Sequence, residues 1–272
     1  MLRMISVFLI AAFLPTLALA NWTSSAPKAI AGWEAHNPGK SQAIDHSTWD
    51  RLLKKYIRRD SRGLNRFAYS RVSAADKAAL DAYIQSLSRI SITQRSRAVQ
   101  KAYWLNLYNA VTVDLILDNY PVNSIRDIKS GLVSIGPWKK KLVKVQGVDL
   151  TLDNIEHNIL RPIWQDPRIH YGVNCASVGC PNLHTQAFTG RNTDKLLDSL
   201  ARDYVNSPRG LSISSSGRVT VSKIYKWFAF DFGNSEQNVI AHLSRYATPE
   251  RRAALANVSR ISNTRYDWAL NE

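Results

Sequence analysis

The chain has 272 residues, of which 45% are hydrophobic and 21% charged. This composition is typical of a globular protein and excludes a disordered, collagenous or fibrous chain. Eight Trp, eleven Tyr and seven Phe residues supply enough apolar area for a core that needs no disulfide or metal. The formal net charge of +15 favours solubility and weak attraction to anionic polymers or proteins of the cell envelope, and it predicts no sequence-specific nucleic-acid binding.

The first twenty residues have the pattern of a signal peptide. Arg3 supplies a positive charge, residues 4–15 form a short apolar run, and Ala18-Leu19-Ala20 has the small residues that signal peptidase requires. A retained membrane anchor is the alternative, which the short run and Pro15 disfavour. We expect cleavage after Ala20 and a periplasmic or secreted protein, not an integral membrane protein, because no later stretch is long and apolar enough to span a bilayer.

The mature chain is expected to begin with an arm and to continue as one domain. Two prolines and two glycines interrupt residues 21–44, which predicts an extended, weakly ordered arm. Residues 45–272 contain no repeat and no low-complexity linker, so we expect a single globular domain there. The spacing of apolar residues predicts helices over residues 49–57, 74–87, 95–119, 153–160, 192–204, 236–246 and 249–256. Ser73 and Thr151 are the expected N-caps of the second and fourth helices, and Arg161-Pro162 is expected to end the fourth.

The helix over residues 95–119 is apolar on every side, which predicts a buried central helix. Asn106 and Asn109 lie inside it, one turn apart. A buried amide must find hydrogen-bond partners or destabilise the fold. We therefore expect these two side chains to hold neighbouring loops in place, including a loop that carries the chemistry.

Alternating residues predict two β-hairpins, one formed by residues 141–145 and 148–150 and the other by residues 211–213 and 218–221. Further strands are expected over residues 169–173 and over residues 266–270. The sequence therefore predicts an α+β fold, namely a helix-rich single domain with a buried central helix and small antiparallel β-hairpins.

Residues 170–184 hold both cysteines of the chain, Cys175 and Cys180, and two of its six histidines, His170 and His184. On a strand, His170 and Cys175 point to opposite faces, so they converge only if the chain turns at Asn174. Such a turn would aim backbone N–H groups inward, which lowers a thiol pKa and can bind an oxyanion. Cys175 is thus a candidate nucleophile, His170 a candidate base and Asn174 a candidate oxyanion donor.

The helix before this segment offers a second base. Asp153 and His157 are four residues apart, so the carboxylate can orient one imidazole nitrogen and leave the other free. Glu156 is adjacent and can accept a proton or pair with Arg161. The candidate catalytic residues are therefore Cys175, His170, His157, Asp153, Glu156 and Asn174.

Four separated segments carry a resemblance to a known family. They are Trp104–Ala110, Asp153–Arg161, His170–Pro181 and Tyr266–Trp268. In this order they resemble the family called domain of unknown function 547 (DUF547), over residues 73–268. The resemblance implies an exported bacterial protein and supplies no established activity. The Cys and His residues also look like those of papain-like or transglutaminase-like thiol enzymes, which however place their Cys at the start of the buried helix.

Three functions are compatible with these residues. The first is a thiol-dependent hydrolase or acyl transferase of the cell envelope with Cys175 as the nucleophile. The second is a non-catalytic binding or scaffold module in which Cys175 and Cys180 form a disulfide, as an oxidising compartment favours. The third is a zinc site formed by His170, Cys175, Cys180 and His184. No cofactor is expected, because the chain has no Gly-rich phosphate loop, no His-Glu-x-x-His and no Gly-x-Ser-x-Gly motif.

Overall fold

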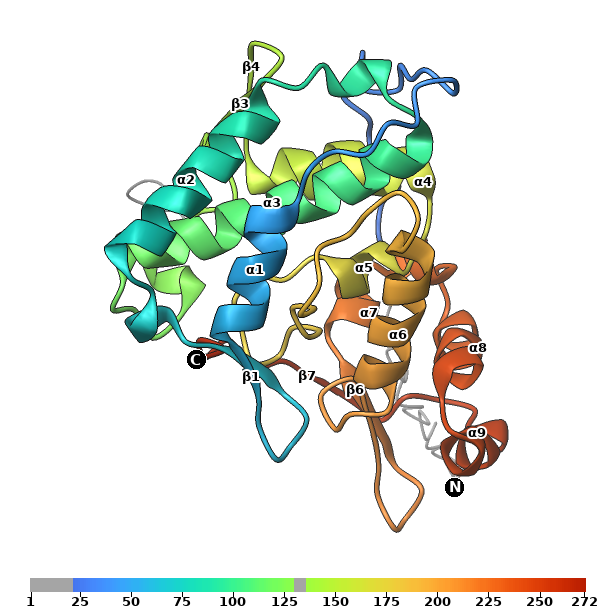
Figure 1. Ribbon diagram of the computed structural model, residues 1–272. Coiled ribbons are helices and arrows are strands. Elements are labelled where there is room, and N and C mark those ends of the chain that lie inside the picture. Colours follow the sequence, from blue (N-terminus) through green and yellow to red (C-terminus); the bar gives the residue numbers. More distant parts are fainter. Residues whose placement is uncertain (1–21, 130–135) are drawn as a thin grey trace, which may run out of the picture.

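The computed structural model describes residues 22–129 and 136–272. The signal peptide predicted over residues 1–20 lies outside these ranges. Within them, the predicted α+β fold is confirmed, with many helices and small sheets of two or three strands around a buried central helix (Figure 1).

Helices account for most of the regular structure. The α-helices are α1 (Ser47–Tyr56), α2 (Ala74–Ser88), α3 (Arg97–Asn119), α4 (Arg161–Trp164), α5 (Ile169–Gly172), α6 (Thr193–Val205), α7 (Ile224–Trp227), α8 (Glu236–Tyr246) and α9 (Pro249–Ala256). A π-helix, η4 (Asn154–Leu160), leads directly into α4. Short 3-10 helices are η1 (Tyr69–Arg71), η2 (Ile92–Gln94), η3 (Ile125–Asp127) and η5 (Ala229–Phe232).

The strands are short and lie at the edges of the helical core. They are β1 (Ile57–Arg59), β2 (Asn65–Phe67), β3 (Val143–Val145), β4 (Val148–Leu150), β5 (Leu211–Ile213), β6 (Val219–Ser222) and β7 (Asn263–Arg265). Antiparallel pairs form between β1 and β2, between β3 and β4, and between β5 and β6. Both predicted hairpins are therefore confirmed. The prediction missed that β7 adds to β6 in parallel, with Val221 opposite Thr264.

Helix α3 is the centre of the core. Leu105, Leu107 and Ile116 are fully buried, and the side chains of Asn106 and Thr112 are buried among them. In Figure 1, α3 crosses the upper half of the molecule, while α6, α8 and α9 lie at the lower right. The buried central helix is thus confirmed, as are both predicted N-caps: Ser73 Oγ accepts from Asp76 N–H at 3.2 Å and Thr151 Oγ1 accepts from Asn154 N–H at 3.0 Å.

The described part of the arm contains no helix or strand, and both of its tryptophans are buried. Trp22 and Trp33 are each only 6% exposed. Trp33 packs edge-on against Trp104 of α3, with ring centroids 5.1 Å apart. Ile30 N–H donates to Asn158 O of η4 at 3.1 Å. Burial of the two indole rings attaches this segment to the core. The Pro and Gly residues of the segment give no indication of this attachment.

Three local predictions are corrected. The helix predicted over residues 153–160 does not end at Arg161-Pro162 but continues into α4, whose first turn tolerates Pro162 because no N–H is needed there. Residues 169–172 of the strand predicted over 169–173 form the helical turn α5 instead, since periodicity cannot separate helix from strand in so short an apolar run. Residues 266–270 are extended, yet only Leu270 pairs as a strand residue, opposite Ser177.

Candidate functional site

A pocket of about 250 Å³ opens between α3, η4, α7 and the end of the chain. Its walls bring together five of the six candidate residues, because Asp153, Glu156, His157, His170 and Cys175 all line it. The other lining residues are Tyr108, Trp138, Val173, Cys180, Ile224, Trp227, Phe228, Tyr266 and Trp268. The sixth candidate, Asn174, does not line the pocket.

Cys175 lies in a tight loop of residues 173–182, here called the cysteine loop. The chain turns at Ala176, which has a positive φ of 55°, a conformation that is uncommon for a residue with a side chain and often marks a functional site. Asn174 Oδ1 accepts the Ala176 N–H at 2.9 Å and Asn174 Nδ2 donates to Pro181 O at 2.7 Å. Asn174 therefore closes the loop upon itself, and its amide is not presented as an oxyanion donor.

Two backbone N–H groups of this loop are bonded to carbonyls of residues 267 and 269 and not to an oxyanion site, in contrast to the prediction. Val178 N–H donates to Ala269 O and Gly179 N–H donates to Asp267 O, each at 2.8 Å. A Cβ on Gly179 would lie 2.7 Å from the Asp267 nitrogen, so only glycine allows this approach. The carbonyls of Asp267 and Ala269 therefore occupy two backbone N–H groups that could otherwise bind an oxyanion.

The buried asparagines of α3 hold two loops, as predicted. Asn109 Oδ1 accepts the Asn174 N–H at 2.8 Å, and Asn109 Nδ2 donates to Gly172 O at 2.8 Å. Asn106 makes the same pair of bonds to Phe188, accepting its N–H at 3.0 Å and donating to its carbonyl at 2.8 Å. Asn109 thus fixes the entry to the cysteine loop.

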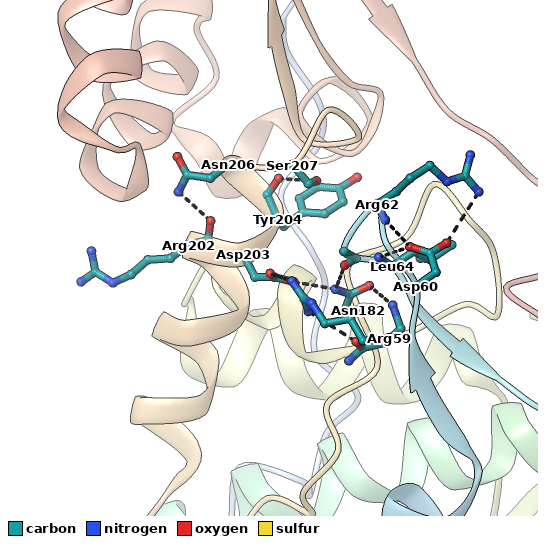
Figure 2. A network of polar contacts seen from close by, with 12 residues as sticks. Arg59, Asp60, Arg62, Leu64, Asn182, Arg202, Asp203, Tyr204, Asn206 and Ser207 are labelled. Atoms are coloured by element: carbon teal, nitrogen blue, oxygen red, sulfur yellow. Dashed lines mark hydrogen bonds and ion pairs between the residues drawn. The ribbon is translucent and has the colours of Figure 1, made fainter.

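The exit of the cysteine loop is fixed by a polar network around Asn182 (Figure 2). Asn182 Nδ2 donates to Asp203 Oδ2 of α6 at 2.5 Å, and Asp203 pairs with Arg59 of β1. Arg209 donates to Asn182 Oδ1 at 2.9 Å and also to the carbonyl of Cys180. Both cysteines are therefore held on a loop anchored at its two ends.

The Cys175 sulfur has three polar neighbours. Cys175 Sγ lies 2.9 Å from Cys180 Sγ, 2.9 Å from Tyr266 Oη and 3.2 Å from Ser177 Oγ. Contact with Cys180 lowers the pKa of the Cys175 thiol, and the two hydroxyls add to this effect, while burial opposes it. A thiolate at Cys175 is thus stabilised by neutral donors. Among the described residues, no His side chain is in hydrogen-bond contact with this sulfur.

Cys180 differs from Cys175 in exposure and in acidity. Cys180 is only 4% exposed, whereas Cys175 is partly exposed. Burial, together with the contact with Cys175, raises the pKa of the Cys180 thiol well above its ordinary value. The backbone N–H of Cys175 donates to Cys180 Sγ at 3.1 Å. The two sulfurs are in contact, and both cysteines are free thiols in this structure.

Both ring nitrogens of His170 face carboxylates. Nε2 lies 2.6 Å from Asp231 Oδ2, and Nδ1 lies 3.4 Å from Glu156 Oε1. Burial lowers the pKa of His170, but these two carboxylates outweigh it and the net shift is upward. Burial likewise raises the pKa of Glu156, yet His157, His170 and Arg161 bring it down to about 2. Both ring nitrogens of His170 are thus in contact with carboxylates, which leaves neither nitrogen free to act as a base for Cys175.

His157 lies farther from its carboxylates than His170 does, and its Nδ1 is also 3.4 Å from Arg161 Nη1. Its Nε2 lies 3.8 Å from Asp153 Oδ1, the four-residue pairing that the sequence predicts, and its Nδ1 lies 3.8 Å from Glu156 Oε1. Burial and the charge of Glu156 raise the pKa of Asp153. The π-helical turn of η4 places all three side chains on the pocket wall, and such turns are frequent at functional sites.

Residues 92–205 match the family model described as "Protein of unknown function, DUF547". The matched segment is less than half of the chain. It contains α3, η4 and the cysteine loop, and hence all six candidate residues, which confirms the resemblance within this range. The Tyr266–Trp268 motif lies outside it. The search of curated proteins and the search of solved structures found no match for the chain.

Three residues outside the candidate set contact its members, and of these three only Tyr266 lines the pocket. Tyr266 contacts the Cys175 sulfur, Ser177 contacts both, and Asp231 holds His170. Ser177 and Tyr266 belong to the quoted DUF547-like segments, so the sequence carried a signal for them. Asp231 lies in an aromatic-rich stretch with no motif, and only the fold brings it 2.6 Å from His170.

The zinc alternative has no support in the geometry. Within residues 22–129 and 136–272, no three His, Cys, Asp or Glu side chains are arranged so that they could hold a metal ion. His184 accepts the backbone N–H of Gln186 at 2.9 Å and does not line the pocket. The four ligands proposed for zinc are therefore not brought together.

No helix in the described part of the chain is long and apolar enough to cross a bilayer.

Proposed function

We propose that this protein is a thiol-dependent hydrolase or acyl transferase with Cys175 as its nucleophile. The observation that carries the proposal is the placement of the Cys175 sulfur on the wall of a pocket, within 3.2 Å of Ser177 Oγ and closer still to Cys180 and Tyr266. These contacts favour the thiolate, which is the reactive form of cysteine. A thiol with a lowered pKa in a cleft is a typical catalytic nucleophile.

The chemical step follows from the residues that line the pocket. The Cys175 thiolate attacks the carbonyl carbon of an ester, thioester or amide, a C–S bond forms, and the bond to the leaving group breaks. His157 in its protonated form donates a proton to the leaving group. Water or another acceptor then attacks the thioester, His157 takes the proton back, and the Cys175 thiolate is released.

Tyr266 and Ser177 are the donors that can stabilise the oxyanion. Their hydroxyls lie 2.9 Å from one another and both contact the Cys175 sulfur, where the negative charge begins. Once the thiolate has attacked, the negative charge moves from the sulfur to the carbonyl oxygen of the substrate. Both hydroxyls can then donate to this oxyanion. They take the role that the sequence analysis gave to Asn174 and the backbone amides, which are bonded elsewhere.

The scaffold alternative rests on one observation, the contact of Cys175 and Cys180 sulfurs at 2.9 Å. A structural disulfide would occupy the only cysteines of the chain and leave the pocket without a nucleophile. The buried carboxylates and histidines around the pocket give a scaffold no benefit, since buried ion pairs contribute little net stability. The enzyme proposal therefore explains more of the site.

The experiment is acylation of the reduced protein by p-nitrophenyl acetate. We expect a burst of p-nitrophenolate equal to the protein concentration and an acetyl group on Cys175, detected by peptide mass spectrometry. Cys175→Ala should abolish the burst. His157→Gln should slow the steady-state release that follows the burst at least tenfold, while His36→Gln, a change on the arm, should leave it unaltered. A burst that persists in Cys175→Ala, or acetylation elsewhere, would overturn the proposal.

We also propose that the protein is exported and that residues 1–20 are removed. Support comes from the charged start, the short apolar run and the Ala18-Leu19-Ala20 pattern. N-terminal sequencing of protein from the periplasmic fraction of an expressing bacterium tests this. Asn21 as the first residue is expected, and an intact Met1 in a membrane fraction would contradict it.

A further inference from the structure

The positions of Cys175 and Cys180 suit thiol–disulfide exchange. The Cys175 and Cys180 sulfurs are 2.9 Å apart and a disulfide bond needs a separation of about 2.05 Å, so a small side-chain movement joins them. Both belong to the cysteine loop, which Asn109 holds at its start and Arg209 holds at its end through Asn182. The bond can therefore form or break without unfolding the surrounding core.

The two sulfurs are unequally accessible. Both cysteines line the pocket, but Cys175 is partly exposed, while Cys180 is only 4% exposed and receives the Cys175 N–H on its sulfur. A reagent that enters the pocket meets Cys175 first. Cys180 then lies in position for attack on any sulfur attached to Cys175, because the two sulfurs are already in contact.

We propose that the protein carries out thiol–disulfide exchange with disulfides that bear an aromatic or other apolar group, with Cys175 as the attacking and Cys180 as the resolving residue. The proposal relies on the same nucleophilic Cys175 as the acyl-transfer proposal but needs neither His157 nor Asp153. It gives Cys180 a function that acyl transfer does not require.

The exchange is balanced in two steps. The Cys175 thiolate attacks one sulfur of the substrate disulfide, a mixed disulfide forms, and the other half leaves as a thiolate. Cys180 then loses its proton to solvent and attacks the Cys175 sulfur, which releases the second half as a thiolate. The substrate disulfide is reduced by two electrons, and the Cys175–Cys180 dithiol is oxidised to a disulfide.

The preference for an aromatic group comes from the mouth of the pocket, here called the aromatic rim. Its members pack against one another and are Trp138, Trp227, Tyr266 and Trp268. Trp227 is 40% exposed, which is high for so large an apolar side chain at a pocket mouth. The rim provides ring faces on which the apolar half of a disulfide can stack next to Cys175.

A basic residue borders the rim. The guanidinium of Arg126 lies over the Trp268 ring, 5.3 Å from its centroid. The Arg126 side chain is exposed. An apolar group that carries a carboxylate would therefore be attracted to this mouth as well as stacked upon it.

The test uses dithiobis-nitrobenzoate, an aromatic disulfide with a carboxylate on each ring, added to the reduced protein. We expect release of two equivalents of the coloured thiolate, the second at a rate that does not depend on reagent concentration. The product should have lost the mass of two hydrogen atoms. Cys180→Ser should release one equivalent and stop at the mixed disulfide on Cys175. Cys175→Ser should react at least tenfold more slowly, because Cys180 is buried.

Two outcomes would overturn the proposal: a wild-type protein that stops at the mixed disulfide, or a Cys175→Ser variant that reacts as fast as wild type. Trp227→Ala tests the aromatic preference, and it should slow the first step severalfold while leaving alkylation by iodoacetamide unchanged. An equal effect on both reagents, or none on either, would contradict that preference. Acylation of Cys180→Ser by p-nitrophenyl acetate separates the two proposals, since it should persist if acyl transfer is right, whatever the outcome of exchange.

Discussion

Asn109, in the middle of the buried helix α3, accepts a hydrogen bond from the backbone N–H of Asn174, the residue before Cys175, at 2.8 Å. The same side chain donates to Gly172 O at 2.8 Å. One amide in the core therefore satisfies two polar groups at the entry to the cysteine loop. The position of the Cys175 sulfur is linked in this way to the most buried element of the fold.

Asn109→Leu should lower the free energy of unfolding by about 1–3 kcal/mol, because Gly172 O and Asn174 N–H lose their buried partner. The rate at which iodoacetamide alkylates Cys175 should also change, since the loop is released at one end. Urea unfolding and timed alkylation measure the two effects.

Asn106→Leu is the matched control for this change. It removes an equivalent pair of bonds, to Phe188, and should destabilise by a similar amount. Its Cys175 alkylation rate should match wild type, because Phe188 lies outside the cysteine loop. Equal alkylation rates in all three proteins would show that Asn109 does not position the thiol.

Much of this arrangement could be predicted from the sequence. Helix α3 is apolar on every side, so its burial and the loop-holding role of Asn106 and Asn109 follow from the cost of an unsatisfied amide. The turns of η4 bring Asp153 and His157 to one face, as their spacing implies. These features depend on local spacing and on burial, which a sequence records directly.

The remaining features depend on contacts between distant segments. Tyr266 is 91 residues from Cys175 and Asp231 is 61 residues from His170, and no periodic pattern connects either pair. The strand predicted at residues 169–173 failed because a short apolar run fits helix and strand equally well. The sequence makes His170 a candidate base on the expectation that a turn at Asn174 brings it to Cys175, whereas both of its ring nitrogens contact carboxylates in the structure.

Asp231→Asn should destabilise the protein by about 3 kcal/mol, since it leaves the buried cations His170 and Arg161 without a shared carboxylate. It should also lower the pKa of His170, because a contact that raises this pKa is removed. Urea unfolding and an NMR titration of the histidine ring signals measure these effects. An unchanged His170 titration would contradict the ion-pair assignment.

The raised pKa of His170 also determines how the free energy of unfolding changes with pH. The folded protein holds the His170 proton more tightly than the unfolded chain, so the stability it contributes is present at low pH and is lost as pH rises through the folded pKa. In Asp231→Asn this loss should be smaller and should be complete at a lower pH, because the folded pKa is closer to the unfolded value. Unfolding curves collected from neutral to alkaline pH compare the two proteins.

For His46 we predict the opposite effect, a loss of stability as the pH falls below neutrality. His46 is 6% exposed with Nδ1 2.7 Å from Tyr83 Oη, and burial lowers its pKa to about 4. The unfolded chain takes up the proton first, so stability should fall by on the order of 1–3 kcal/mol as pH drops from about 6.5 to about 4. His46→Gln should flatten this part of the stability curve, and His36→Gln should not. A slope that is the same in all three proteins would contradict the prediction.

The most direct test of a nucleophilic Cys175 is the pH profile of its alkylation by iodoacetamide in the reduced, folded protein, with each cysteine quantified by peptide mass spectrometry. The contacts of the sulfur predict that Cys175 reacts with an apparent pKa below the ordinary value of about 8.5, and that Tyr266→Phe raises this value. Cys180 should react only after unfolding. If Cys175 instead titrates at or above the value of an ordinary thiol, or if Cys180 is alkylated first, Cys175 is not the nucleophile.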